Sequence, residues 1–185
     1  MSIVAKVREI VKNDSGEWDW KYHITPVVRY SLELAEKLDA DIEPVEIGAL
    51  LHDIGRIRFN PKDHEITGIS EAEKILKALN YPDEKIEEIK HIVESHRGSG
   101  TVKPKTLAAK IVANADAMAH FAVIPAMMQI ALKVKEGDLV EAFDWIDKKV
   151  ERDWEAKLTL PEARELMEGH YRAIRLLFDS MKEYL

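Results

Sequence analysis

Apolar residues recur along this chain at intervals of three and four, the spacing that places them on one face of an α-helix. No stretch alternates apolar and polar residues for long enough to predict a strand. The pattern therefore predicts an all-α fold. We expect helices over the following residues, in chain order: 3–13, 18–38, 43–53, 64–79, 82–96, 106–120, 125–135, 139–155 and 161–184.

Proline and glycine mark the breaks in this pattern. Pro26 lies inside the second helical segment, so we expect that helix to kink or restart just after His23, because proline removes a backbone donor and disfavours helix at the preceding residue. Residues 56–63 contain an Asn-Pro pair and are predicted to form a loop. The chain has 185 residues, enough to bury a substantial core, and we expect a single domain over 1–185.

Composition narrows the class of protein. The chain has no cysteine, which excludes disulfides and thiolate metal sites and suits a reducing compartment, so we expect a cytoplasmic protein. No run approaches the roughly 20 apolar residues of a membrane span, so we expect no membrane partner. The formal net charge of −7 argues against a general nucleic-acid binder. A small anionic substrate is compatible with this charge, because a metal and a few local cations can outweigh it.

Ionisable residues stand where the apolar pattern predicts burial. His52 and Asp53 end an apolar run, and Asp116 lies inside another. Burying a carboxylate is costly unless a cation meets it. Histidine and carboxylate together suit Mn, Fe, Co, Ni or Zn better than calcium, and helical bundles build such sites from neighbouring helices. Three further histidines flank these positions along the chain: His23, His64 and His96.

These residues resemble the HD-domain metal-dependent phosphohydrolases. In that family a first histidine precedes a His-Asp doublet that ends an apolar helix, and a distant aspartate follows in an Ala-Asp context. The matching positions are His23, His52-Asp53 and Asp116, and the resemblance covers about residues 20–120. The remaining third, about residues 121–185, matches only in its helical character. The resemblance implies an all-α fold, these four ligands around one divalent metal, and hydrolysis of a nucleotide or another phosphate ester.

Some members of the family hold a second metal through two further histidines. His64 and His96 stand at the matching places, and the resemblance favours His96 over His91. It leaves open whether the two ligate a second metal or contact a substrate phosphate. We therefore expect one ion, leave a second open, and keep Mg²⁺ beside the transition metals.

The mechanism that follows is hydrolysis by a metal-activated water. Asp53 would bridge two metals if two bind, Arg56 is the first candidate for a cation that meets charge on the phosphoryl oxygens, and Glu65 could protonate the leaving group. His120, one turn after Asp116, is expected to be a satisfied histidine of the core or its rim. Weaker candidates for the cation are Arg97, Lys103 and Lys110.

Two other functions stay open. One is a regulatory HD module that binds a nucleotide without turnover, and the other is a diiron HD-type oxygenase. The small size of the chain favours a nucleotide or another small phosphorylated compound as the substrate. The helices after residue 120 could form a lid or a dimer face, so a homodimer also stays open.

Overall fold

The computed structural model describes residues 1–59, 64–97 and 102–184, except for the side chains of residues 64 and 65. Throughout these ranges the regular structure is helical and contains no strand, which confirms the predicted all-α fold. In chain order the elements are α1 (Ile3–Asp14), α2 (Glu17–Asp19), the π-helix η1 (Trp20–Ile24), α3 (Thr25–Lys37), α4 (Ile42–Leu51), α5 (Ile54–Arg58), α6 (His64–Ala78), α7 (Asp83–Ser95), α8 (Leu107–Ala122), α9 (Ile124–Val134), α10 (Leu139–Arg152), the π-helix η2 (Asp153–Lys157), α11 (Pro161–Met181) and the 3-10 helix η3 (Lys182–Tyr184).

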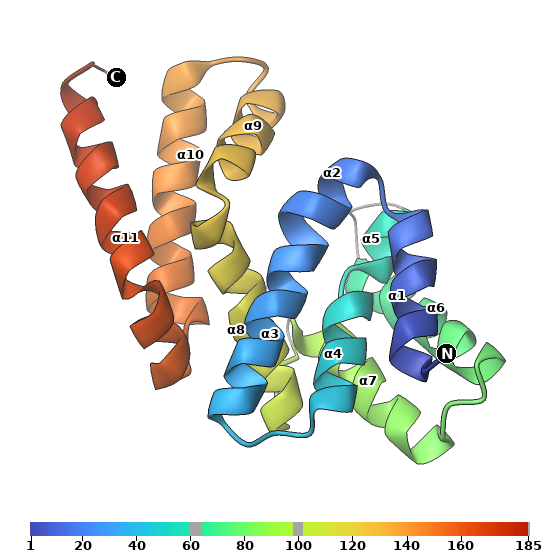
Figure 1. Cartoon of the computed structure of the whole chain (residues 1–185). Coiled ribbons are helices and arrows are strands. Elements are labelled where there is room, and N and C mark those ends of the chain that lie inside the picture. Colours follow the sequence, from blue (N-terminus) through green and yellow to red (C-terminus); the bar gives the residue numbers. More distant parts are fainter. Residues whose placement is uncertain (60–63, 98–101, 185) are drawn as a thin grey trace.

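Helix α8 is the centre of the fold. It is rich in alanine and buried along most of its length, so neighbouring helices can approach its backbone closely. It packs against α3, α4 and α7 on one side and against α11 on the other. Figure 1 shows α1 to α7 gathered on one side of α8, whereas α9, α10 and α11 form a separate layer on the other side. A site on α8 is therefore reached by residues from both halves of the chain.

The break expected near Pro26 is a π-helix. The N–H of Thr25 bonds the carbonyl of Trp20, five residues earlier, so one extra residue is accommodated in the turn that carries His23. Helix α3 then begins with Pro26 in its first turn, where a missing N–H costs little. Single π-turns of this kind occur frequently at functional sites.

The predicted loop over 56–63 is wrong in its first part, because Ile54–Arg58 forms α5. The apolar side chain of Ile54 is fully buried and that of Ile57 packs against the core, so a helical turn satisfies both the backbone and the core. Residues 60–63 lie outside the described part of the chain. The α-helix predicted over 139–155 ends three residues earlier than expected, at Arg152, where the π-helix η2 begins.

Asn114 ties the turn before α11 to the central helix. Its Oδ1 accepts the N–H groups of Thr159 (2.8 Å) and Leu160 (3.0 Å). Its Nδ2 donates to the Thr159 hydroxyl (3.0 Å) and to the Lys110 carbonyl (2.8 Å). The side chain is almost completely buried, so these bonds are shielded from water. The Asn114 amide thereby holds the C-terminal layer against α8, at a position two residues before Asp116 in that helix.

Among the described residues, no single helix has both the length and the apolar character of a membrane span. Helices α8 and α9 meet that test only when taken together, and the chain bends by 85° between them.

Gly48 allows α4 to lie directly against α7. A Cβ atom at this position would meet Ile92 Cγ2 at 2.7 Å and Ile92 Cδ1 at 2.8 Å. Helix α4 is followed by His52 and α7 by His96, so the close approach of the two helices brings both histidines to the same end of the bundle.

We expect Gly48→Ala to lower the free energy of unfolding by about 1–2 kcal/mol, because the methyl group overpacks the core. Gly169 in α11 is the matched control, since a Cβ there meets nothing within 4 Å. Gly169→Ala should instead gain up to about 1 kcal/mol from helix propensity. Urea unfolding measures both changes. If both substitutions stabilised the protein equally, the close approach at Gly48 would be refuted.

Candidate metal centre

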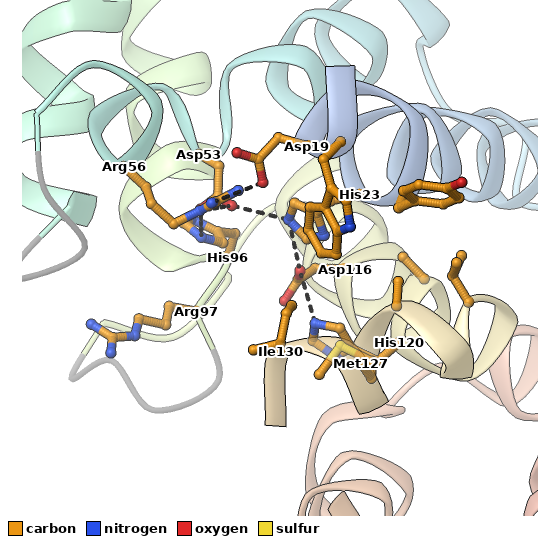
Figure 2. A pocket seen from close by; sticks show the side chains of 15 residues that line it. Asp19, His23, Asp53, Arg56, His96, Arg97, Asp116, His120, Met127 and Ile130 are labelled. Carbon is orange, nitrogen blue, oxygen red and sulfur yellow. Dashed lines mark hydrogen bonds and ion pairs between the residues drawn. The ribbon is translucent and has the colours of Figure 1, made fainter. Parts of the chain in front are cut away.

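Four side chains with nitrogen or oxygen lone pairs meet at the junction of η1, the end of α4 and the middle of α8. Figure 2 labels three of them: His23, Asp53 and Asp116. His23 Nε2 lies 3.0 Å from His52 Nε2, 3.0 Å from Asp53 Oδ2 and 3.7 Å from Asp116 Oδ1. His52 Nε2 lies 3.7 Å from Asp53 Oδ2. The structure therefore brings together the four residues that the resemblance assigns to one metal.

The tautomer of His52 suits a ligand. Its Nδ1 lies 2.7 Å from the carbonyl oxygen of Ala49, and a carbonyl only accepts, so Nδ1 carries the proton and Nε2 offers its lone pair to the cluster. Burial lowers the pKa of His52 to about 3, which keeps the ring neutral. A buried neutral imidazole held by a backbone carbonyl is the form that binds metal ions.

The donor set fits a divalent transition metal. Ligands that share an ion at about 2.0–2.2 Å lie no more than about 4.4 Å apart, and the four quoted distances fall below that limit. The ligand atoms of His23, His52 and Asp53 all lie within 4.8 Å of one another, and Asp116 is grouped with them only through His23. Burial would raise the pKa of Asp116, but Lys157, His120 and His23 hold it well below its usual range, so the carboxylate is charged. Two carboxylates and two imidazoles, all with little exposure, form a site that a cation would satisfy.

His96 repeats the geometry of His52 on the neighbouring helix. Its Nδ1 donates to the Val93 carbonyl at 2.6 Å, and its Nε2 lies 3.5 Å from Asp53 Oδ1. His96 thus faces the oxygen of Asp53 that points away from His23. His91 lies elsewhere, where its Nε2 accepts the N–H of Lys105. The side chains of His64 and Glu65 lie outside the described part of the chain, so their roles stay predictions.

Arg56 contacts the centre through Asp53. Its Nε donates to Asp53 Oδ2 at 2.8 Å, and its Nη1 donates to Asp19 Oδ1 at 3.0 Å. Burial would lower the pKa of Arg56, but the two carboxylates raise it above its ordinary value. The guanidinium therefore orients Asp53 from the edge of the cavity, and its predicted contact with a substrate phosphate stays a prediction.

His120 of α8 and Asp153 of η2 add a histidine–carboxylate pair to the centre. His120 Nδ1 donates to Asp153 Oδ2 at 2.8 Å, while its Nε2 lies 3.8 Å from Asp116 Oδ1. The expectation that His120 is a satisfied histidine is confirmed by this bond, but it is incomplete, because the ring also lines the cavity and stacks at 11° on the ring of His23. His23, Asp116 and His120 form a second group whose ligand atoms lie within 4.8 Å of one another.

Asp153 is a buried carboxylate that the sequence analysis missed. It has no exposed surface and lies 3.0 Å from Lys149 Nζ and 3.7 Å from Lys157 Nζ. Burial would raise its pKa, but His120 and the two lysines lower it. Lys157 Nζ also lies 3.5 Å from Asp116 Oδ2 and so connects the two carboxylates. One feature of the sequence indicates that Asp153 is buried, because it continues the apolar stripe of Phe143, Ile146 and Val150 at helical spacing.

The centre opens into a cavity of about 320 Å³. Part of the lining is polar and includes His23, Asp53, Arg56 and Asp116, and another part is an apolar wall. Trp18 stands at the rim, where its Nε1–H donates to Gln129 Oε1 on α9 at 2.7 Å. A ligand with a charged head and an apolar body fits this division. The apolar wall consists of Ala119, Val123, Ala126, Met127 and Ile130.

Comparison with known proteins agrees with this arrangement. The family model of the HD domain matches residues 20–120, more than half of the chain. The chain belongs to the HD domain family. The four ligands of the centre all lie within the matched segment, whereas Asp153 and Lys157 of this HD protein lie beyond it.

Solved structures show the same fold. Bacillus subtilis YpgQ in complex with ADP has a TM-score of 0.79 at 22% identity, covering 99% of this chain and 95% of that chain. A predicted HD superfamily hydrolase from an uncultured Thermotogales bacterium has a TM-score of 0.66 at 20% identity, covering 98% and 92%. This HD protein therefore shares the fold of these two structures.

Two archaeal relatives share more sequence. The tRNA (cytidine(56)-2'-O)-methyltransferase of Picrophilus torridus is 33% identical over 147 residues, which are 72% of this chain and 41% of the relative. The uncharacterized protein MJ0778 of Methanocaldococcus jannaschii is 35% identical over 130 residues, 60% of this chain and 72% of the relative. The chain thus spans about two fifths of the length of the matched methyltransferase.

Proposed function

We propose that this HD protein is a metal-dependent phosphohydrolase that acts on a nucleotide or another small phosphate ester. The observation that carries the proposal is the meeting of His23, His52, Asp53 and Asp116 beside a cavity that also has an apolar wall. When bound, a divalent transition metal would supply a Lewis acid and an activated water at this site.

Residues of the chain orient the metal ligand and bind the substrate. Arg56 keeps Asp53 oriented through the 2.8 Å bond between Nε and Oδ2, and adds positive charge at the polar part of the cavity. The apolar wall accommodates the organic part of the substrate and excludes water from it. The ADP bound to YpgQ, a protein of the same fold, supports a nucleotide as the substrate.

We expect hydrolysis to depend on the metal. Purified protein should contain about one equivalent of transition metal, and a chelator should abolish phosphate release from a panel of nucleotides and phosphate esters. Mn²⁺ or Co²⁺ should restore it. Elemental analysis and phosphate release are measured on the same samples. Intact metal binding without turnover of any ester would refute hydrolysis and favour a regulatory nucleotide-binding module.

Two additional measurements on the same protein test other functions. Oxygen consumption by iron-loaded protein would indicate a diiron oxygenase instead. A tRNA transcript belongs in the binding panel because of the methyltransferase relatives. Tight, salt-resistant binding of that transcript would contradict the expectation drawn from the net charge of −7.

A further inference from the structure

His120 faces the same carboxylate oxygen as the first ligand of the metal centre. Its Nε2 lies 3.8 Å from Asp116 Oδ1, the oxygen that also lies 3.7 Å from His23 Nε2. In Figure 2 Asp116 stands between His23 and His120 and is joined to both. One ligand atom from each of these three residues lies within 4.8 Å of the other two. The nitrogen of His120 is therefore about as close to Asp116 as the nitrogen of His23 is.

The hydrogen bond on the other side of the ring fixes the tautomer of His120. Its Nδ1 lies 2.8 Å from Asp153 Oδ2, and an ionised carboxylate only accepts, so Nδ1 carries the proton. At 3.8 Å, Nε2 is too far from Asp116 Oδ1 to donate a hydrogen bond to it. Histidines that bind metals usually donate their other N–H to a carboxylate or a carbonyl, as His52 does to Ala49. His120 thus has the arrangement of a ligand, with a lone pair at Nε2.

The partner of His120 is buried together with further charge. Asp153 has no exposed surface, and Lys149, which pairs with it at 3.0 Å, has 13% of its side chain exposed. A buried set of charges is often no more stable than apolar side chains of similar volume. A histidine that only filled space in the core would not need such a partner. The buried carboxylate holds the ring in one orientation, which is what a metal ligand requires.

The two groups of ligand atoms favour one shared ion over two. His23 belongs to both groups, and its Nε2 has one lone pair, so it can bind one ion only. A second cation beside Asp116 would also be repelled by the ammonium group of Lys157, which lies 3.5 Å from Asp116 Oδ2.

We propose that His120 is a fifth ligand of the metal and that Asp153 positions it. This inference rests on the metal centre of the proposed function and adds to it a residue beyond the matched HD segment, because that segment ends at residue 120. Three imidazoles and two carboxylates favour a transition metal over Mg²⁺, which prefers oxygen ligands. Five protein ligands also exceed the three of a typical catalytic zinc site. The class of ion expected here is therefore Mn, Fe, Co or Ni.

The test is the NMR spectrum of the protein loaded with one equivalent of Co²⁺. An imidazole bound to Co²⁺ through Nε2 keeps a proton on Nδ1, and this proton gives a strongly shifted signal that disappears in D₂O. The bond to Asp153 should slow the exchange of this proton with water. We expect one such signal of the wild type to be absent from both His120→Ala and His120→Gln. The glutamine can still donate to Asp153, so this variant keeps the buried carboxylate satisfied if the alanine variant does not fold.

Affinity for Co²⁺, measured by competition with a chelating dye, gives a second readout. His120→Gln should lower the affinity at least as much as loss of a residue that orients a ligand, about 10–100-fold. His170→Ala, which removes an exposed histidine of α11, is the matched control and should keep every signal and an affinity within about twofold of the wild type.

Asp153→Asn tests the positioning role. The signal of His120 should remain but move and exchange faster with water, because a neutral amide oxygen is a weaker acceptor than a carboxylate. A signal that neither moves nor exchanges faster would show that Asp153 does not hold the ligand.

If His120→Gln keeps every shifted signal of the wild type, His120 is not a ligand and the inference is overturned. That result together with phosphate release by the wild type would leave the proposed function standing. The NMR and affinity measurements need no turnover. Loss of the signal as expected, in a protein that hydrolyses no phosphate ester, would instead refute the proposed function and leave the fifth ligand in place.

Discussion

Replacing Asp53 by asparagine is expected to strip the protein of its metal and of its hydrolytic activity. The substitution keeps the size of the side chain but removes the charge that faces His23 at 3.0 Å and His96 at 3.5 Å. Loss of a residue that merely orients a ligand typically lowers metal affinity 10–100-fold, so loss of a ligand should lower it by more than about 100-fold. Elemental analysis after dialysis measures the metal content, and phosphate release measures the activity.

Asp19→Asn is the matched control for metal content. Asp19 also accepts a hydrogen bond from Arg56, at 3.0 Å, but it lies outside the group of ligand atoms that meet at His23 and His52. It should keep the metal of the wild type, and circular dichroism should show both variants folded. Full metal occupancy in Asp53→Asn would mean that Asp53 is not a ligand, and the proposed centre would have to be abandoned.

Replacing Asn114 by alanine is expected to cause the largest loss of stability. The substitution removes four hydrogen bonds and leaves the N–H groups of Thr159 and Leu160 without their acceptor in a buried turn. At about 0.5–1 kcal/mol for each of the four bonds, the free energy of unfolding should fall by about 2–4 kcal/mol. Urea unfolding monitored by circular dichroism measures this change.

Two variants distinguish the loss of the Asn114 hydrogen bonds from general effects of substitution on stability. Asn114→Asp keeps an oxygen that accepts both N–H groups but loses the amide donors, so its stability should lie between those of wild type and Asn114→Ala. Asn13→Ala, on the exposed end of α1, should change stability by less than about 0.5 kcal/mol. If Asn114→Ala were as stable as Asn13→Ala, the amide would not hold the two layers together.

The metal centre was largely predictable because its ligands interrupt apolar patterns. His52 and Asp53 follow a run that is buried on every face, and Asp116 lies in a helix whose neighbouring residues are buried. A charged residue in such a place needs a partner, and the spacing matched a known family. The same reasoning placed His96 at the site, and in the structure its Nε2 lies 3.5 Å from Asp53 Oδ1.

The contribution of the C-terminal layer was not predictable in the same way. Lys149 and Asp153 lie in a segment dense in charge, which is typical of a solvated helix face. The pairing of Asp153 with His120 and with Lys149 depends on how α10 and η2 pack in three dimensions. The helical turn at Ile54–Arg58 was missed because glycine and a nearby Asn-Pro pair are also typical of loops. Side-chain pairing across elements and short helices both depend on tertiary packing, which periodicity does not report.

His23 lies in the π-turn at Trp20–Ile24. Its position therefore depends on the number of residues in this turn as well as on their identity. Loss of one residue from this turn would return it to an ordinary α-helix and rotate everything before it by about 100° relative to α3. Trp18, at the rim of the cavity, would then face a different neighbour. Along this stretch, single substitutions should therefore be far better tolerated in evolution than single-residue deletions.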